Sequence, residues 1–372
     1  MTDVNTMRDP TDWKTEEMQR RIRRRYGAER RFRLVGLGAV LLSASFLAFL
    51  LFTMVGNGIS GFSQTQVQVD VSRPDETSFA SELAVAGVTG STGRTWLPAS
   101  ADIEAAAKGD GSPEAERTLT VLEREGRART GINWNFLTGS DATDPTAVGI
   151  WGAFKGSLLT MLVTLALSFP IGVLSAVYLE EYAPRNRWTD IIEISINNLA
   201  AVPSIIFGLL GLAVFLNFMH LPRSAPLVGG ITLALMTMPV IVIAGRNAIK
   251  SVPPSIRDAA LGVGASRIQV VFHHVLPLAL PGILTGTIIG MARALGETAP
   301  LLMIGMRAFI ASPPGGLTEP ATVLPVQIFL WSDEVSRGFV EKTSAAIIVL
   351  LIFLLAMNGL AIYLRNKFET RW

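Results

Sequence analysis

The sequence predicts an all-α polytopic membrane protein with six transmembrane helices and a long polar insert after the first. The chain has 372 residues, of which 49% are hydrophobic and 17% charged, and its mean hydropathy is +0.42. This composition is too apolar for an ordinary soluble protein of that length. Six apolar segments approach or exceed the roughly 20 residues that a helix needs to cross hydrocarbon. The segments are 34–55, 158–179, 196–218, 227–244, 282–304 and 345–364.

The basic residues indicate which ends of these segments face the cytoplasm. The stretch RRIRRRYGAERRFR, residues 20–33, precedes the first segment, and such a block holds its end of a helix in the cytoplasm. Basic residues also follow the even-numbered segments: Arg185, Arg187, Arg246, Lys250, Arg257, Arg267, Arg365, Lys367 and Arg371. We therefore expect both termini to be cytoplasmic. No clear A-x-A cleavage site follows the first segment, which is interpreted as an uncleaved anchor.

This topology divides the chain into successive parts. They are a basic N-terminal segment (1–33), an anchor helix (34–55), an extracytoplasmic insert (56–149), a domain of five membrane helices with a cytoplasmic loop at 246–281 (150–364), and a cytoplasmic tail (365–372). In the insert we expect one helix capped by Ser112 and ending at Gly126, and another capped by Ser100 and stopped by Gly109. Large apolar residues are few there, so the insert is interpreted as partly ordered with a small core. A docking surface for a periplasmic partner is the alternative.

Composition also excludes several kinds of chemistry. The chain has no cysteine, which excludes disulfides, thiolate metal sites and cysteine nucleophiles. Its histidines are His220, His273 and His274, and adjacent side chains on a helix point about 100° apart, which disfavours a shared metal. No G-x-x-x-x-G-K-[ST] phosphate loop occurs, so the chain cannot bind ATP in that way. We expect no enzyme activity and no cofactor in this chain, and we assign its net charge of +2 to membrane topology rather than to nucleic acid.

The cytoplasmic stretch between the fourth and fifth segments is longer than a helix hairpin needs. It reads RDAALGVGASRIQVVFHHVLPLALPG over residues 257–282. Small residues let a short helix approach another protein closely, and Gly264 permits a sharp break. Pro277 and Pro281 are expected to stop a second helix before the next crossing. The pattern predicts a helix, a turn and a helix at the membrane face, shaped to fit a cleft in a partner.

This stretch resembles the cytoplasmic loop of the permease subunits of bacterial ATP-binding cassette (ABC) importers. Their loop carries EAA, three residues, Gly, nine residues and I-x-L-P, and here the same spacing reads DAA, LGV, Gly264, nine residues and HVLP. Asp258 stands in place of Glu, and His274 in place of Ile. The resemblance implies a type I ABC importer permease fold, and coupling of the loop to partner ATPases. The residues it marks for coupling are Arg257, Asp258, Ala259, Ala260, Gly264, Ala265, His274, Leu276 and Pro277.

Three further stretches are similar to the PstA-type permease family of the bacterial phosphate importer. They read AVPSIIFGLLGL (201–212), ARALGETAPLL (292–302) and LPVQIFLW (324–331). GETAPLL is the most discriminating, because the paired permease of that importer and the sulfate and molybdate permeases diverge within it. The resemblance covers about residue 131 to the carboxyl end. It implies a subunit of the bacterial inner membrane that imports inorganic phosphate.

The same resemblance implies partners. They are a second homologous permease (PstC-like), two ABC ATPase subunits that bind ATP and Mg (PstB-like), and a periplasmic phosphate-binding protein (PstS-like). ATP binding would draw the ATPases together, move the cytoplasmic loop and open the permease pair outward, and hydrolysis would reset it. Membrane lipid surrounds such a subunit.

Polar residues inside the apolar segments suggest a substrate pathway. Arg293 lies halfway along the fifth segment, where a charge costs at least about 2.5 to 3.5 kcal/mol. Glu297, four residues on, lies on the same helical face and can pair with it. A guanidinium matches phosphate oxygens, so this pair and Thr298 are assigned to the pathway, with a purely structural ion pair as the alternative. Pro203 and Ser204 in the third segment either line the pathway or only kink the helix.

Other functions stay open at the level of sequence. The first is a permease for another oxyanion, such as sulfate or molybdate. A secondary transporter driven by an ion gradient would need paired intramembrane carboxylates or inverted repeats, and the sequence shows neither. A membrane protein that signals phosphate supply is the third, because nothing in these residues distinguishes sensing from transport.

Overall fold

The computed structural model describes residues 15–88, 93–336 and 338–368, and the chain divides into two compact units, residues 1–54 and 55–372. The described part of the first unit belongs to helix α1 (Glu16–Ile59), which has 44 residues and is about 66 Å long. Its most apolar window has a mean hydropathy of 2.4 and no buried residue. A helix that is apolar all round suits lipid. The expected basic segment and anchor are thus one continuous helix, although residues 1–14 and 369–372, with Arg371, lie outside the described residues.

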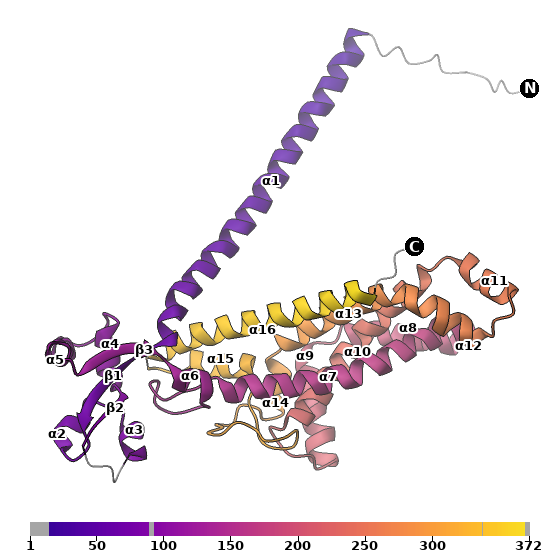
Figure 1. Ribbon diagram of the computed structural model, residues 1–372. Helices are drawn as coiled ribbons and strands as arrows, with labels where there is room; N and C mark the ends of the chain where they lie inside the picture. Colours follow the sequence, from indigo (N-terminus) through magenta and orange to yellow (C-terminus); the bar gives the residue numbers. More distant parts are fainter. Residues whose placement is uncertain (1–14, 89–92, 337, 369–372) are drawn as a thin grey trace, which may run out of the picture. The chain divides into compact units, whose positions relative to one another are not determined.

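Four long helices form the membrane part of the second unit and run alongside one another in Figure 1. They are α7 (Trp151–Val177), α10 (Pro226–Lys250), α13 (Leu276–Leu295) and α16 (Gly338–Phe368). Glycines let them pack closely: a Cβ on Gly172 of α7 would lie 2.8 Å from Ile241 of α10, and one on Gly290 of α13 would lie 2.9 Å from Thr237. These four helices contain or overlap the second, fourth, fifth and sixth predicted segments, which confirms the helical membrane fold.

The third predicted segment is not one straight helix, and this corrects the sequence prediction. Helix α8 (Arg187–Ala200) and helix α9 (Ser204–Leu210), which continues as the π-helical η3 (Gly211–Phe218), are bent from each other by 103°. Pro203 lies at the break and is the N-cap of α9. Proline has no N–H to donate and forces the preceding residue out of the helical region, so a continuous helix cannot pass through it.

The fifth predicted segment is also interrupted. Helix α13 ends at Leu295, residues 296–298 are not helical, and the short α14 (Ala299–Met303) follows. Pro300 in the first turn of α14 would clash with the carbonyl of Gly296 in a continuous helix, and glycine itself weakens a helix interior. At its other end α13 begins earlier than predicted, because the cytoplasmic helix runs into it without a stop.

The remaining elements connect and cover this bundle. Segment η2 (Tyr178–Tyr182) is a π-helical end of α7, and α15 (Leu324–Ser332) is a short, largely buried helix before α16. Three groups of buried side chains form the core, of which one joins the start of α7, α15 and the start of α16 around Leu324 and Trp331. The other two lie deeper in the bundle. One joins α10, α13, α14 and the loop before α15 around Leu301 and Met306, and the other joins α7, α10 and α13 around Ile241 and Ile283.

The insert is a folded α/β subdomain at one end of the bundle (Figure 1). Its antiparallel sheet has the order β2-β1-β3 and is formed by β1 (Ser63–Asp70), β2 (Arg94–Pro98) and β3 (Ala128–Ile132). The other elements of the insert are η1 (Ser60–Phe62), α2 (Pro74–Thr77), α3 (Glu82–Gly87), α4 (Ala101–Ala107), α5 (Pro113–Arg124) and α6 (Trp134–Thr138). The sheet was not predicted.

The predicted insert helices are present and their caps explain where they begin and end. The Ser112 hydroxyl accepts a hydrogen bond from the backbone N–H of Ala115 at 3.2 Å, and Gly126 just after α5 has φ +68°. Helix α4 ends before Gly109, whose φ is +82°, as expected, but the Ser100 side chain at its N-cap makes no capping hydrogen bond, so the predicted side-chain cap is wrong. Both helices pack on β1 through a core that includes Val67, Ile103 and Leu119.

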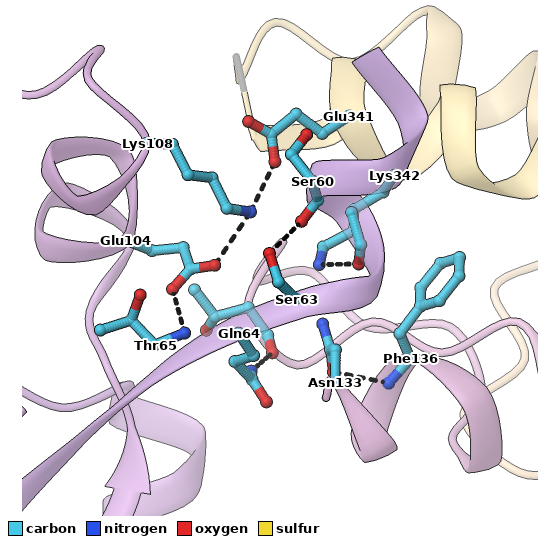
Figure 2. Close-up of polar contacts among 12 residues, drawn as sticks. Ser60, Ser63, Gln64, Thr65, Glu104, Lys108, Asn133, Phe136, Glu341 and Lys342 are labelled. Atoms are coloured by element: carbon cyan, nitrogen blue, oxygen red, sulfur yellow. Dashed lines mark hydrogen bonds and ion pairs between the residues drawn. The ribbon is translucent and has the colours of Figure 1, made fainter. Parts of the chain in front are cut away.

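Polar contacts fasten the insert to the start of α16, as Figure 2 shows. Lys108 lies 2.9 Å from Glu104 Oε1 and 2.6 Å from Glu341 Oε2. The ammonium of Lys342, which is only 3% exposed, donates to the Gly61 carbonyl at 3.1 Å. The insert is therefore attached to α16 by an ion pair between Lys108 and Glu341 and by a hydrogen bond from Lys342 to a backbone carbonyl of the insert.

Candidate functional site

The predicted helix–turn–helix protrudes at the end of the bundle opposite the insert (Figure 1). Its first helix is α11 (Pro254–Gly262), and the turn after it is a Schellman motif. The N–H of Gly264 donates to Leu261 O at 3.0 Å and the N–H of Ala265 donates to Ala260 O at 3.1 Å. Gly264 has φ +88°, the left-handed region that glycine adopts without strain. The sharp break expected at Gly264 is thus present.

We call this protruding helix–turn–helix, residues 254–275, the knob, and its second helix starts with a capping box. Ser266 Oγ accepts from the Gln269 N–H at 3.3 Å, and Gln269 Oε1 accepts from the Ser266 N–H at 2.9 Å. Helix α12 (Arg267–Gln269) and the π-helical η4 (Val270–Val275) then continue into α13. The expected stop at Pro277 and Pro281 is therefore wrong. The ring of Pro277 and its lack of an N–H donor would break a regular α-helix. The wider π-helical turn η4 immediately before Pro277 leaves room for the ring and needs no hydrogen bond from that residue.

The outer surface of the knob is open and partly apolar. Asp258 and Ala259 are exposed, whereas Ala260 is buried against the bundle. Four large apolar side chains are also exposed: Leu261, Val263, Ile268 and Phe272. Val263, at the tip, is 86% exposed. An exposed apolar patch on a rigid protrusion indicates a protein contact.

The predicted coupling residues thus fall into two groups. Asp258, Ala259, Gly264 and His274 are exposed, whereas Leu276 and Pro277 are half-buried at the base of α13. Ala265 packs with Ala260 against the buried cluster, which completes the turn. Among the described residues, no group of three or more His, Cys, Asp or Glu side chains could hold a metal ion.

Arg257 holds the knob against the end of the second membrane helix. Its guanidinium donates to Glu181 Oε1 at 2.6 Å and to the carbonyls of Val252 and Ile249 at 2.7 and 3.0 Å. These contacts turn α11 into a rigid extension of the bundle, because bidentate and charge-assisted hydrogen bonds fix orientation. Arg257 is therefore a residue that positions the knob and does not form its outer face.

A second arginine makes a similar clamp one element away. Arg246 of α10 lies 2.5 Å from Glu180 Oε1 and 2.7 Å from Glu193 Oε2 of α8. Sequence analysis used Arg246 only as a marker of topology and missed its acidic partners. The EEYAP stretch, residues 180–184, could have indicated these partners. It directly follows the second segment, on the side of the membrane where the basic residues of the 246–281 loop are also expected.

The predicted pathway residues occupy the break between α13 and α14. Arg293 lies in the last turn of α13 and not halfway along a segment, and its side chain is 48% exposed. Its Nε is 3.5 Å from Oε1 of Glu297, whose side chain is 18% exposed and whose backbone is no longer helical. Thr298 is half-buried at the N-cap of α14. The expected buried pair on one helical face is instead a long, open ion pair at a helix end.

The break in the third segment lies beside this one. Gly208, one turn after Ser204, packs closely on Pro300. A Cβ added to Gly208 would lie 2.6 Å from the Cα of Pro300. Helices α9 and α14 are therefore neighbours, and both begin at broken backbone. Pro203 is exposed and Ser204 half-buried. Asn197 and Asn198 are exposed on α8.

The second unit combines helices long and apolar enough to span a membrane, two adjacent breaks in those helices and a rigid protruding knob. Together these features are typical of the membrane subunit of a transporter. The sequence pattern of the family described as binding-protein-dependent transport system inner membrane component matches residues 168–370. The chain belongs to this family and is a PstA-like ABC permease within it. Its predicted type I ABC importer permease fold and its place in the inner membrane follow from that membership. A domain of unknown function matches residues 19–82, which include most of α1 and all of β1.

Individual relatives share part of the chain. The probable ABC transporter permease protein YqgI of Bacillus subtilis (strain 168) is 29% identical over 256 residues, which are 63% of this chain and 85% of that protein. The phosphate transport system permease protein PstA of Yersinia pestis is 31% identical over 214 residues, 57% of this chain and 71% of that protein. Among solved structures, an inward-facing MetNI methionine ABC transporter chain is 17% identical with a TM-score of 0.46, covering 60% of this chain and 95% of that chain.

Proposed function

We propose that this chain is a permease subunit of an ATP-driven importer that moves inorganic phosphate across the cytoplasmic membrane. The substrate is inferred from relatives of the PstA name, which include the Yersinia pestis protein. The observation that carries the coupling role is the knob itself. It combines a Schellman turn at Gly264, an exposed apolar tip and an arginine clamp to the bundle.

Energy comes from partners, because the sequence has no phosphate loop of its own. Two ABC ATPase subunits bind the knob of this chain and that of a second permease, in clefts that move on ATP binding. A rigid knob transmits such a movement, whereas a flexible loop would absorb it. The Arg257–Glu181 contact lies at the base of α11 and passes the displacement to α7 and α10.

The exposure of Arg293 supports a pathway shared between two permeases. A guanidinium that faced lipid would be costly, so the surface around it must face protein or water. In a permease pair, the second subunit covers this surface and leaves a polar path between the two. Arg293 then presents forked donors to a phosphate passing the breaks before α9 and α14.

Topology completes the proposal. Both termini and the knob are cytoplasmic, as the basic residues indicate, and the folded insert lies on the periplasmic side. A periplasmic phosphate-binding protein delivers the substrate there. The folded sheet of the insert gives this partner a defined surface, in contrast to the partly ordered segment expected from the sequence.

The test is transport selectivity in proteoliposomes that contain this chain, its second permease and the ATPase subunits. We expect labelled phosphate to accumulate only when the ATPase subunits are supplied with ATP and a phosphate-binding protein is present. Sulfate and molybdate should not accumulate. Uptake that continues without ATP and stops when an ion gradient is dissipated would identify a secondary transporter instead. Uptake of sulfate or molybdate through their own binding proteins would identify another oxyanion importer.

A further inference from the structure

A groove in the membrane part of the second unit is lined by α7, α13 and α16. Its volume is about 260 Å³. The lining runs from Leu284 to Met291 on α13 and from Met357 to Leu364 on α16, which is about 10 Å along each helix. Of the lining side chains, all except Thr287 and Asn358 are apolar, and the Thr287 hydroxyl already donates to the Ile283 carbonyl at 2.9 Å. The groove therefore suits a hydrocarbon chain.

An arginine stands at one end of the groove. Arg365 directly follows the lining residue Leu364, and its Nη1 is 3.4 Å from the hydroxyl of Thr285, which directly follows the lining residue Leu284. Its Nη2 makes another long contact, 3.4 Å to Asn366 Oδ1. The Nε is shielded from solvent and has no hydrogen-bond partner in the described chain. The guanidinium thus belongs to the residue that follows the lining of the groove, and both of its Nη hydrogen bonds are long.

We propose that this groove binds an anionic phospholipid, with an acyl chain between α13 and α16 and the phosphate on Arg365. The three helices of the lining are long and apolar enough to cross a membrane, so acyl chains surround them. Arg365 and Lys367 end the apolar part of α16, which places them at the level of headgroups. A phosphate diester supplies closer acceptors to the Nη1 and Nη2 donors than the two 3.4 Å contacts that they make within the chain.

Charge selects an anionic lipid rather than a zwitterionic one. Arg365 and Lys367 lie two residues apart, and basic residues beside a membrane helix attract anionic headgroups. The long 3.4 Å contacts to Thr285 and Asn366 do not compete strongly with a phosphate. The site faces the side that we expect to be cytoplasmic, where the knob also lies. The proposal does not depend on which solute the transporter carries.

The experiment measures retained lipid on the full-length chain. The protein is purified in mild detergent, placed in phosphatidylcholine nanodiscs with increasing phosphatidylglycerol, and examined by native mass spectrometry after release. Wild type is expected to retain one phosphatidylglycerol. Arg365→Gln should weaken retention about tenfold or more, because it removes charge-assisted hydrogen bonds. Ala361→Phe should abolish it by filling the groove.

Two matched controls keep the result specific. Arg187→Gln removes the same charge from an exposed position on α8, and Ile352→Phe adds bulk to an exposed position of α16 outside the lining. Both should retain lipid as wild type does. Equal lipid retention by Arg365→Gln and wild type would overturn the proposal. Because Arg365→Gln adds no bulk to the protein, this comparison remains valid even if Ala361→Phe does not fold. A photo-cross-linker at position 360 that captures a polypeptide instead of phospholipid would also overturn it.

Discussion

Gly264 shows how the backbone conformation of one residue sets the turn of the knob. Its φ of +88° closes the Schellman turn, and a Cβ there would meet nothing within 4 Å. The constraint is therefore conformational and not steric. A β-branched residue in this region of φ is strained by about 1 to 3 kcal/mol, which the exposed turn can relieve only by moving.

Gly264→Val is expected to disconnect ATP hydrolysis from transport while the complex still assembles. Hydrolysis stimulated by loaded binding protein and phosphate uptake should both fall, whereas basal hydrolysis by the ATPases should persist. The matched control is Gly262→Val, because Gly262 is two residues away, also has open space for a Cβ and has no positive φ. Purified complexes would be compared for ATPase retention, stimulated hydrolysis and uptake. Full coupling in Gly264→Val would show that the turn is only a connection.

Arg293 supports a second prediction. Since its pair with Glu297 is long and open, the pair contributes at most about 1 kcal/mol, and Arg293→Gln should leave a folded, assembled complex. Phosphate uptake should nevertheless fall severely, and Arg293→Lys should fall between, because lysine keeps the charge but loses the fork. The measurement is uptake per assembled complex. Normal uptake by Arg293→Gln would remove this residue from the pathway.

Sequence reasoning at single residues succeeded where local chemistry decides the structure. Gly264, Ser112 and Gly126 were assigned to a turn and caps, and the structure confirms each. It failed for Arg293 because the expected environment came from average hydropathy. Helix α13 ends just after Arg293 because Gly296 and Pro300 follow it. A hydropathy average over some 20 residues does not register the effect of these two residues.

At the level of elements, the base of the knob is the most testable contact. Glu181→Gln removes the charge that Arg257 meets at 2.6 Å but keeps an acceptor of the same shape. We expect a less rigid knob, a loss of about 1 to 3 kcal/mol from the weakened charged hydrogen bonds, and reduced coupling with little change in basal hydrolysis. Hydrogen exchange of residues 254–265 should rise. The exposed Asp190→Asn on α8 is the control, and equal exchange in both variants would contradict the clamp.

Asp141 makes a pH prediction for the element that precedes α7. Burial raises the pKa of this carboxyl above its usual range, although the Trp331 indole N–H donates to it at 3.0 Å. The folded state therefore holds the proton more tightly than the unfolded state, and stability should fall as pH rises through the raised pKa. Asp141→Asn should abolish that slope in thermal unfolding measured as pH rises from the usual range of an aspartic acid through the raised pKa. A slope that persists in the variant would assign it to other groups.

Elements were predictable only where hydropathy and helix length coincide. The spans carried by α7, α10 and α16 needed only a long apolar run. An irregularity at Pro203 was expected from the proline itself, although not a bend of 103°, whereas the break at Gly296 was missed because apolar residues continue across it. The sheet of the insert was missed for a different reason: β1 reads SQTQVQVD, and the polar residues Gln64 and Thr65 are buried on its two opposite faces, so the strand lacks the apolar composition expected of a buried element.

For the whole molecule, the two ends of the second unit have different tasks. The insert end is fastened to α16 by Lys108 and Lys342, and the other end carries the knob fastened by Arg257. Between them, α7, α10 and α13 pack closely through glycines, which suits a subunit that moves as a rigid body. A movement imposed at the knob should therefore reach the two breaks in the membrane helices.

The central claim is that partner ATPases drive phosphate through this permease by way of the knob. The most direct measurement is ATP hydrolysis by the reconstituted complex, in wild type and in Gly264→Val, with phosphate-loaded, sulfate-loaded and empty binding proteins. The account predicts stimulation of wild type by the phosphate-loaded protein alone, with phosphate accumulating, and no stimulation of Gly264→Val above its basal rate. Equal stimulation of both complexes, or stimulation of wild type by a sulfate-loaded protein, would contradict it.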